Sequence, residues 1–147
     1  MFKIFIRMLS VLALLSGCTQ LGPTPAATQA VHIDGTPGKA VVYVVRTRPD
    51  MSYLTAPIMV DDTPLGATYA GTYMRLELTP GQHVLRGYAQ DNGSIKMNVQ
   101  ADRVYFVQHS VAGSWRVTSP HSFFTVIDEA RARAAMVGAS LAGAGST

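Results

Sequence analysis

The sequence is poor in cysteine and in charge. Cys18 is the single cysteine among 147 residues, which excludes an intramolecular disulfide and any metal site made of several thiolates. Charged residues make up 14% of the chain, below the roughly 25% of typical soluble domains. Hydrophobic residues make up 48%, too many for a disordered chain, and the length suits a single domain.

Motifs of the common enzyme classes are also missing. The chain has neither a G-x-G-x-x-G run nor a P-loop, the usual phosphate-binding loops, and it has no G-x-S-x-G nucleophile elbow. Its two glutamates, Glu77 and Glu129, stand far apart, which gives little support to hydrolysis by paired carboxylates. We therefore predict that the protein is not an enzyme and uses no cofactor.

The four histidines show no metal-binding spacing. Neither H-x-H nor H-x-x-x-H occurs, so we predict no metal site. His32 falls in a proline- and glycine-containing stretch, where we expect a solvated side chain. A site in which folding brings His83, His109 or His121 beside a carboxylate remains an open alternative.

The first 17 residues predict a lipoprotein signal peptide. Lys3 and Arg7 form a positive start, and a short apolar run follows over residues 8–15. That run is too short for a permanent membrane-spanning helix, which needs about 20 residues. The sequence Leu15-Ser16-Gly17-Cys18 resembles the bacterial lipobox, so we predict that Cys18 is acylated and becomes the new N-terminus.

The predicted anchor also indicates a location. Each buried CH₂ of an acyl chain adds about 0.8 kcal/mol of membrane affinity, so two or three chains on one residue hold a protein stably. The residue after the cysteine is Thr19 and not an aspartate. By resemblance to Gram-negative lipoprotein sorting, this points to the inner leaflet of the outer membrane, with the domain in the periplasm. Loss of Lys3 and Arg7 lowers the net charge from +3 by two, to +1, which argues against nucleic-acid binding.

A tether and a β domain follow the anchor. Residues 18–38 contain Pro, Gly, Ala and Thr without a sustained period, which predicts a flexible linker. Residues 39–126 show short β-branched or alternating runs separated by turn residues, typical of a small antiparallel β-sandwich of seven or eight strands. The expected strands are 40–46, 56–61, 72–78, 83–90, 94–100, 103–110, a short segment at 115–117, and 123–127.

The C-terminal part predicts one α-helix over residues 127–143. Asp128 and Glu129 suit a helix N-terminus, and apolar residues recur at i+3 and i+4 from Ile127 to Leu141. Three roles are compatible with this pattern: the helix covers the sheet, binds a partner, or frays. Residues 143–147 are expected to be a flexible end.

A series of motifs carries a family resemblance. These motifs are Tyr43-Val44-Val45-Arg46 with Arg48-Pro49, Met59-Val60-Asp61-Asp62, Leu65-Gly66, Gly71-Thr72-Tyr73, Leu78-Thr79-Pro80-Gly81-Gln82-His83, Val104-Tyr105-Phe106-Val107 and Val126-Ile127-Asp128-Glu129-Ala130. In this order they resemble a family of short bacterial lipoproteins, domain of unknown function twenty-eight forty-six, over residues 39–137. The resemblance implies a periplasm-facing β domain on a lipid anchor, with no established activity and no catalytic residues.

Two aromatic residues are candidates for contact with a partner. Trp115 follows a Gly-Ser pair and either fills the edge of the core or marks an exposed patch, which Tyr73, Tyr53 and Tyr69 would extend. The leading hypothesis is a non-catalytic module that binds an envelope protein or stabilises an envelope assembly. The alternative is a periplasmic small-ligand-binding protein or enzyme that uses loops at one end of the sandwich. Attachment to peptidoglycan is a third idea, without a motif to support it.

Overall fold

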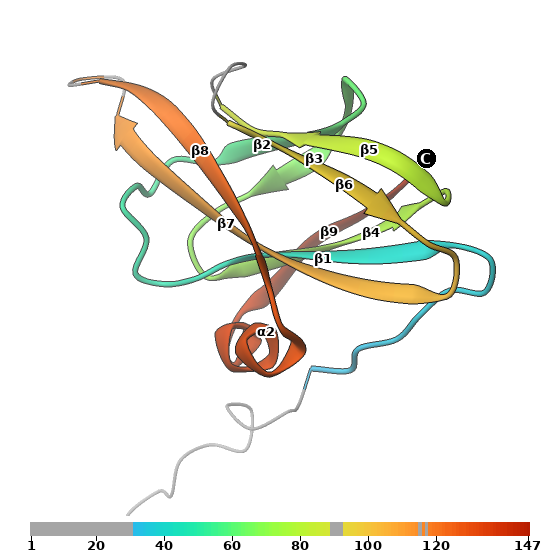
Figure 1. The fold of residues 1–147 in the computed structure, drawn as a ribbon. Coiled ribbons are helices and arrows are strands. Elements are labelled where there is room, and N and C mark those ends of the chain that lie inside the picture. Colours follow the sequence, from blue (N-terminus) through green and yellow to red (C-terminus); the bar gives the residue numbers. More distant parts are fainter. Residues whose placement is uncertain (1–30, 89–92, 115, 117) are drawn as a thin grey trace, which may run out of the picture.

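The computed structural model describes residues 31–88, 93–114, 116 and 118–147. These residues form two β-sheets packed face to face, and the helix α2 (Glu129–Met136) lies against the outer face of the larger sheet (Figure 1). The predicted mostly-β sandwich with one C-terminal helix is confirmed. The described residues contain nine strands, more than the seven or eight expected. Within the same residues, no helix is long and apolar enough to cross a bilayer.

The larger sheet has five strands in the order β8-β7-β1-β4-β9. Its strands are β1 (Ala40–Arg46), β4 (Thr72–Leu78), β7 (Arg103–Ser114), β8 (Thr118–Ile127) and β9 (Ser140–Ser146). The sheet is mixed rather than purely antiparallel, because β1 pairs in parallel with β7 and β4 pairs in parallel with β9. Both parallel partners arrive after long connections, as parallel pairing requires.

The smaller sheet has four strands in the order β3-β2-β5-β6, and all its pairs are antiparallel. Its strands are β2 (Ala56–Val60), β3 (Thr63–Thr68), β5 (Gly81–Arg86) and β6 (Ser94–Val99). Strand β3 was not expected, because Pro64 and Gly66 are typical of a turn. It forms at the edge of the sheet, where a proline interrupts no second ladder.

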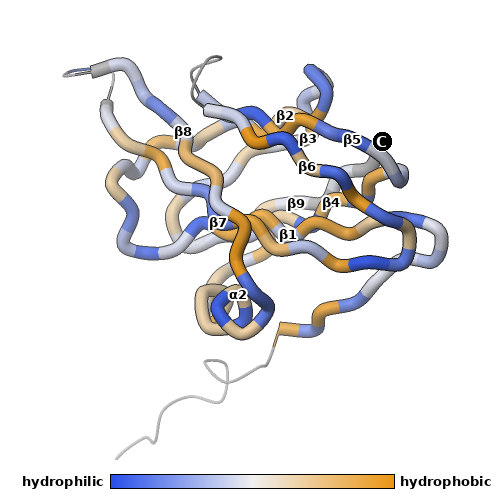
Figure 2. Tube along the Cα trace, viewed as in Figure 1, coloured by the Kyte–Doolittle hydropathy of each residue, from blue (hydrophilic) through white to orange (hydrophobic). Residues whose placement is uncertain are grey.

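Strand β1 is buried on both faces, as its apolar run predicts. The side chains of Val42 and Val44 enter the core between the sheets, whereas Tyr43 and Val45 enter a second cluster on the outer face of the larger sheet, which we call the outer core. Figure 2 shows hydrophobic segments along the strands that face one another. Each such aliphatic side chain contributes roughly 1.5–3 kcal/mol when fully buried, so β1 links two cores.

Helix α2 covers the outer core. Its N-cap is Asp128, whose Oδ1 accepts a hydrogen bond from the Arg131 amide at 2.8 Å, and Glu129 occupies the favourable first turn. The helix buries Ala132 and Met136 against the sheet. Of the three roles compatible with the sequence, the structure therefore has the first.

The chain before β1 also lies on this face. Val31 and Ile33 pack against the outer core. The Tyr43 hydroxyl donates to Oδ1 of Asp34 at 2.9 Å, and the Thr36 hydroxyl donates to Glu77 at 2.7 Å. The chain therefore joins the domain several residues before 38, where the tether was expected to end.

This coverage changes the environment of β4. The sequence predicts that Tyr73, Arg75 and Glu77 face solvent, but all three are half-buried. Arg75 donates to Glu77 at 2.5 Å and to Asp34 at 3.2 Å, and the Tyr73 ring lies 6.4 Å from that of Tyr43. The alternation of β4 is real, but its second face is partly covered because Asp34 and Thr36, in the chain before β1, contact Arg75 and Glu77.

The expected helix over 127–143 is too long. Helix α2 ends at Met136, and Gly138 adopts φ +71°, a conformation that terminates helices at glycine. Residues 140–146 then form β9 beside β4, in place of the expected flexible end. The close packing needs small residues, because a Cβ on Gly145 would lie 2.9 Å from the Leu65 Cβ.

Candidate functional site

Several connections meet at one end of the sandwich. Strand β1 ends there, since Arg46 pairs with the first residue of β4, Thr72. Strand β7 runs parallel to β1 and continues beyond it into the β7–β8 hairpin, and β9 begins beside Thr72 at Ser140. We call this region the loop end; it comprises the described residues of 47–55, 69–71, 110–123 and 137–141.

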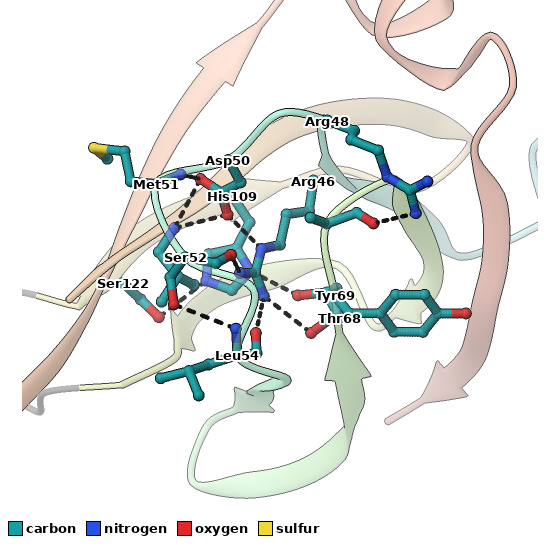
Figure 3. A network of polar contacts seen from close by, with 12 residues as sticks. Arg46, Arg48, Asp50, Met51, Ser52, Leu54, Thr68, Tyr69, His109 and Ser122 are labelled. Carbon is teal, nitrogen blue, oxygen red and sulfur yellow. Dashed lines mark hydrogen bonds and ion pairs between the residues drawn. The ribbon is translucent and has the colours of Figure 1, made fainter. Parts of the chain in front are cut away.

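Arg46 organises the loop end from below. The residue is fully buried, and its guanidinium donates to Asp50 Oδ2 at 2.5 Å from Nε (Figure 3). The two terminal nitrogens donate to main-chain carbonyls: Nη1 to Leu54 at 2.7 Å and Thr68 at 3.1 Å, and Nη2 to Ser52 at 2.6 Å. A buried cation is tolerated only when it is paired and hydrogen-bonded in this way.

Asp50 extends the same network to a third segment. One of its oxygens accepts from the Met51 amide at 2.8 Å, and the carboxylate also accepts from the Val111 amide at 3.2 Å from Oδ2. Together, Arg46 and Asp50 bind the 47–55 connection to the end of β3 and to β7. The 47–55 connection is thereby tied to two strands of different sheets.

His109 forms a second buried polar link beside Arg46. Its Nδ1 lies 2.9 Å from the Thr68 hydroxyl, its Nε2 lies 2.9 Å from the Ser122 hydroxyl, and its ring stacks on Phe124 with centroids 4.5 Å apart. Burial, and secondarily the charge of Arg46, lowers the pKa of His109 to about 3. The ring is therefore neutral at physiological pH and joins β3, β7 and β8.

The Ser122 hydroxyl is fully engaged. It accepts a hydrogen bond from the Tyr88 amide at 2.8 Å and lies beside His109 Nε2. Gly87 closes over it, since a Cβ at that position would lie 2.1 Å from the Ser122 oxygen. A serine beside a histidine is the beginning of a nucleophilic site, but both side chains have no exposed surface, so the arrangement supports packing.

Exposed apolar side chains gather at the loop end. Seven large apolar side chains are exposed in the described part of the chain, and six of them lie here: Met51, Tyr53, Tyr69, Phe123, Val137 and Leu141. The seventh, Val126, pairs with Val107 in the middle of the sheet. Tyr53 is 84% exposed although the carbonyls on both sides of it, of Ser52 and Leu54, are held by Arg46. Contiguous exposed apolar patches mark interaction surfaces, so these six side chains are candidates for such a surface.

The charges of the loop end have one sign. Among its described residues the only carboxylate is Asp50, which is buried and paired with Arg46. Arg48 and Arg116 are exposed and have no carboxylate within ion-pair distance in the described part of the chain. The loop end is therefore both apolar and positively charged.

A hollow of about 420 Å³ lies between the Arg48 side of the loop end and the C-terminal end of α2. Small side chains form most of its wall. Its lining residues are Thr47, Arg48, Gly71, Ala134, Ala135, Val137, Gly138 and Ala139. The volume falls within the range of small-molecule sites.

The other histidines do not join His109. His83 lies on β5, where its Nδ1 is 2.5 Å from Asp61 Oδ2 and its Nε2 is 2.7 Å from the Thr79 carbonyl oxygen. His121 Nδ1 lies 2.7 Å from the Ser119 carbonyl oxygen on the hairpin, and His32 is exposed. Within the residues that the structure describes, no three His, Cys, Asp or Glu side chains are placed to hold a metal ion.

The residues proposed for anchoring and contact are only partly in view. Cys18 and Trp115 lie outside the described residues. Tyr73 packs in the outer core against Tyr43. Its contact with a partner stays a prediction, because only part of its side chain is exposed. Tyr53 and Tyr69 are exposed at the loop end, as expected of residues in a contact patch.

Sequence reasoning missed Arg46, Asp50 and Arg48 as organisers of this end. A signal was available: a single arginine ends an otherwise apolar strand, and an aspartate follows four residues later. An arginine at the end of a buried strand must find acceptors nearby, which points to the following loop.

Comparison with known proteins adds no relative. No protein-family model matches the chain, and neither a curated protein nor a solved structure matches it. The resemblance to the lipoprotein family therefore stays a prediction, and the loop end is the structural feature that bears on function.

Proposed function

We propose that the protein is a bacterial lipoprotein, anchored through acylated Cys18 in the inner leaflet of the outer membrane, whose non-catalytic periplasmic domain binds a partner protein of the envelope. The loop end would be the binding surface. The observation that carries the proposal is the gathering of exposed apolar side chains on a backbone that buried Arg46 holds in place. A preorganised loop loses little entropy on binding, which favours recognition.

The surface has the composition of a contact site. Tyrosine, methionine and arginine are enriched at protein interfaces, and the loop end exposes Tyr53, Tyr69, Met51 and Arg48. Figure 3 shows Met51 and Tyr69 pointing away from the Arg46 network on opposite sides. A partner that contacts both would cover the network and bury the end of the sandwich.

Site-specific photocrosslinking in intact cells tests the binding surface. A photoreactive residue at position 53 should give one dominant adduct with an envelope protein. The same residue at position 126, which is exposed but lies away from the loop end, should not. Equal adducts from both positions, or none from position 53, would contradict the proposal.

The anchor is tested separately. The mass of the mature N-terminal peptide should show an acylated Cys18, and Cys18→Ala should abolish both acylation and membrane retention. An unmodified Cys18 would remove the anchor from the proposal without affecting the loop end.

A second candidate function is the binding of a small ligand at the loop end. The hollow beside Arg48 favours it, because a cation stands at the edge of a wall of small aliphatic residues. The two functions differ in the occupant that they require: a partner protein on the exposed surface, or a small ligand in the hollow.

A further inference from the structure

We infer that the hollow between Arg48 and the end of α2 is a binding site for the carboxylate of a small aliphatic ligand, such as the C-terminus of a peptide that ends in alanine. This inference specifies what the loop end recognises, and in that respect it rests on the proposed binding function. It does not depend on the lipid anchor.

Arg48 is held in position to bind an anion. Its Nη2 donates to the Ala70 carbonyl at 3.0 Å, and the guanidinium packs over Gly71, where a Cβ would lie 2.8 Å from Nε. Gly71 also adopts φ +82°, which side-chain-bearing residues rarely do. Glycine is therefore required here for two reasons, and one of them is the place that Arg48 occupies.

The charge of Arg48 is paired with no carboxylate in the part of the chain that the structure describes. Arg46, Arg75, Arg86 and Arg133 each pair with a carboxylate, whereas Arg48 has none within 4.0 Å among the described residues. Figure 3 shows its side chain directed away from the Arg46 network. An arginine fork is suited to a carboxylate, with which it forms two parallel hydrogen bonds.

The rest of the wall consists mostly of small residues. Ala134, Ala135 and Ala139 present methyl groups, and Gly138 presents no side chain. The wall is fixed to the Arg48 side, because the Ser140 amide donates to the Gly71 carbonyl at 3.1 Å. These small residues leave room beside Arg48 for a carboxylate and the methyl groups next to it, which is the chemistry of an alanyl C-terminus.

The second hollow provides a contrast. It has a similar volume, about 440 Å³, and its lining residues are Gln82, His83, Val84, Lys96, Met97 and Asn98. Its cation, Lys96, therefore stands beside a histidine and two amide side chains, whereas Arg48 stands beside alanines and glycines. We expect the aliphatic carboxylate to prefer the hollow beside Arg48.

Methyl NMR of the mature lipoprotein in detergent micelles tests the inference, with N-acetyl-alanyl-alanine as the probe and its C-terminal amide as the matched control. We expect saturable shifts of the Ala134, Ala135 and Ala139 methyl signals with the acid. The amide should bind about tenfold more weakly, because loss of a charge-assisted hydrogen-bond pair corresponds to roughly 1.4 kcal/mol or more. D- and L-forms of the probe distinguish cell-wall peptides from protein C-termini as the natural source.

Arg48→Gln should weaken binding of the acid to the level of the amide. Arg131→Gln, which removes an exposed arginine from α2 outside the hollow, should leave binding unchanged. Equal affinity for acid and amide, shifts confined to residues outside the hollow, or no saturable shift would each overturn the inference. The acid–amide comparison needs no variant, so it holds even where a substitution affects folding.

The outcome separates this inference from the proposed function. Crosslinking from position 53 with no binding of the peptide acid would leave a protein-binding loop end and refute the carboxylate site. Binding of the acid without any adduct from position 53 would support the carboxylate site and contradict the protein-binding loop end.

Discussion

Nε2 of His109 lies 2.9 Å from Oγ of Ser122, in a region where neither side chain has exposed surface. The distance is that of a base and a nucleophile. However, the Tyr88 amide donates to the serine oxygen and Gly87 packs against it, so no substrate can reach the hydroxyl. What the pair does is connect β7 to β8 next to the buried Arg46. Its consequences should therefore appear in stability and its pH dependence.

Replacement of His109 should flatten the pH dependence of stability below neutrality. The folded-state pKa of His109 is about 3, against an ordinary value of 6.5. As the pH falls below 6.5 the unfolded chain binds a proton that the folded protein does not, so stability declines by about 1.4 kcal/mol per pH unit until the pH nears 3. By pH 5 the wild-type free energy of unfolding should have fallen by about 2 kcal/mol. Urea unfolding measures this free energy, and the His109→Gln variant should lack that fall.

Three carboxylates set the lower limit of the pH range in which the effect of His109 on stability can be measured alone. Hydrogen bonds, from Tyr43 to Asp34, from Val84 to Asp61 and from Arg75 to Glu77, lower the pKa of each carboxylate below its ordinary value of 3.8, 3.8 or 4.5. Their stabilisation is present above those values and is lost as the pH falls through the folded pKa.

The histidine prediction is tested above that range, between about pH 6.5 and 5. If the free energy of unfolding falls equally with pH in wild type and in His109→Gln, the histidine does not contribute to the pH dependence of stability.

Removal of Arg46 should destabilise the protein strongly. Arg46→Met leaves the Asp50 carboxylate, 3% exposed, without its cation and leaves three carbonyls short of a donor. Breaking a buried ion pair from one side costs about 3–5 kcal/mol. In a double-mutant cycle, adding Asp50→Asn to Arg46→Met should cost less than the sum of the single changes. Additive effects in thermal unfolding would mean that the two residues do not act together.

A methyl group at Gly87 should be far less tolerated than one at Gly143. A Cβ at Gly87 would lie 2.1 Å from the Ser122 oxygen, whereas nothing lies within 4 Å of one at Gly143. We expect Gly87→Ala to cost about 1–3 kcal/mol through overpacking, and Gly143→Ala to stay within about 0.5 kcal/mol of wild type. Urea midpoints measure both, and equal midpoints would argue against the close approach of β8 to residue 87.

Hydrogen exchange should distinguish β9 from a frayed tail. Amides of Leu141–Ser146 that face β4 are hydrogen-bonded in the parallel ladder, so they should exchange at least about tenfold more slowly than the same residues in an unstructured peptide. The Thr147 amide, which donates to the Glu77 carbonyl at 3.1 Å, provides the terminal point of the series. Exchange at the unstructured rate throughout would mean that the segment does not pair.

Local sequence pattern was sufficient for much of the sandwich. The apolar run of residues 40–45, which ends at Arg46, predicted a strand buried on both faces, and the alternation of residues 72–78 predicted another central strand. Both strands have the predicted bounds in the structure. Asp128 and Glu129 correctly located the start of α2. These features depend on side chains only a few residues apart, so a linear pattern contains them.

The remaining features depend on distant partners. Residues 140–146, rich in alanine, glycine and serine, have little strand propensity of their own. They pair because β4 offers an open edge and because Gly145, which has no Cβ, leaves room for Leu65. Arg46 appears in the chain as the polar end of a strand, yet its acceptors are Asp50, Ser52, Leu54 and Thr68. Three of these acceptors lie only four to eight residues along the chain, but Thr68 lies 22 residues away. Burial of the cation requires all four groups, and only folding brings them together around the guanidinium.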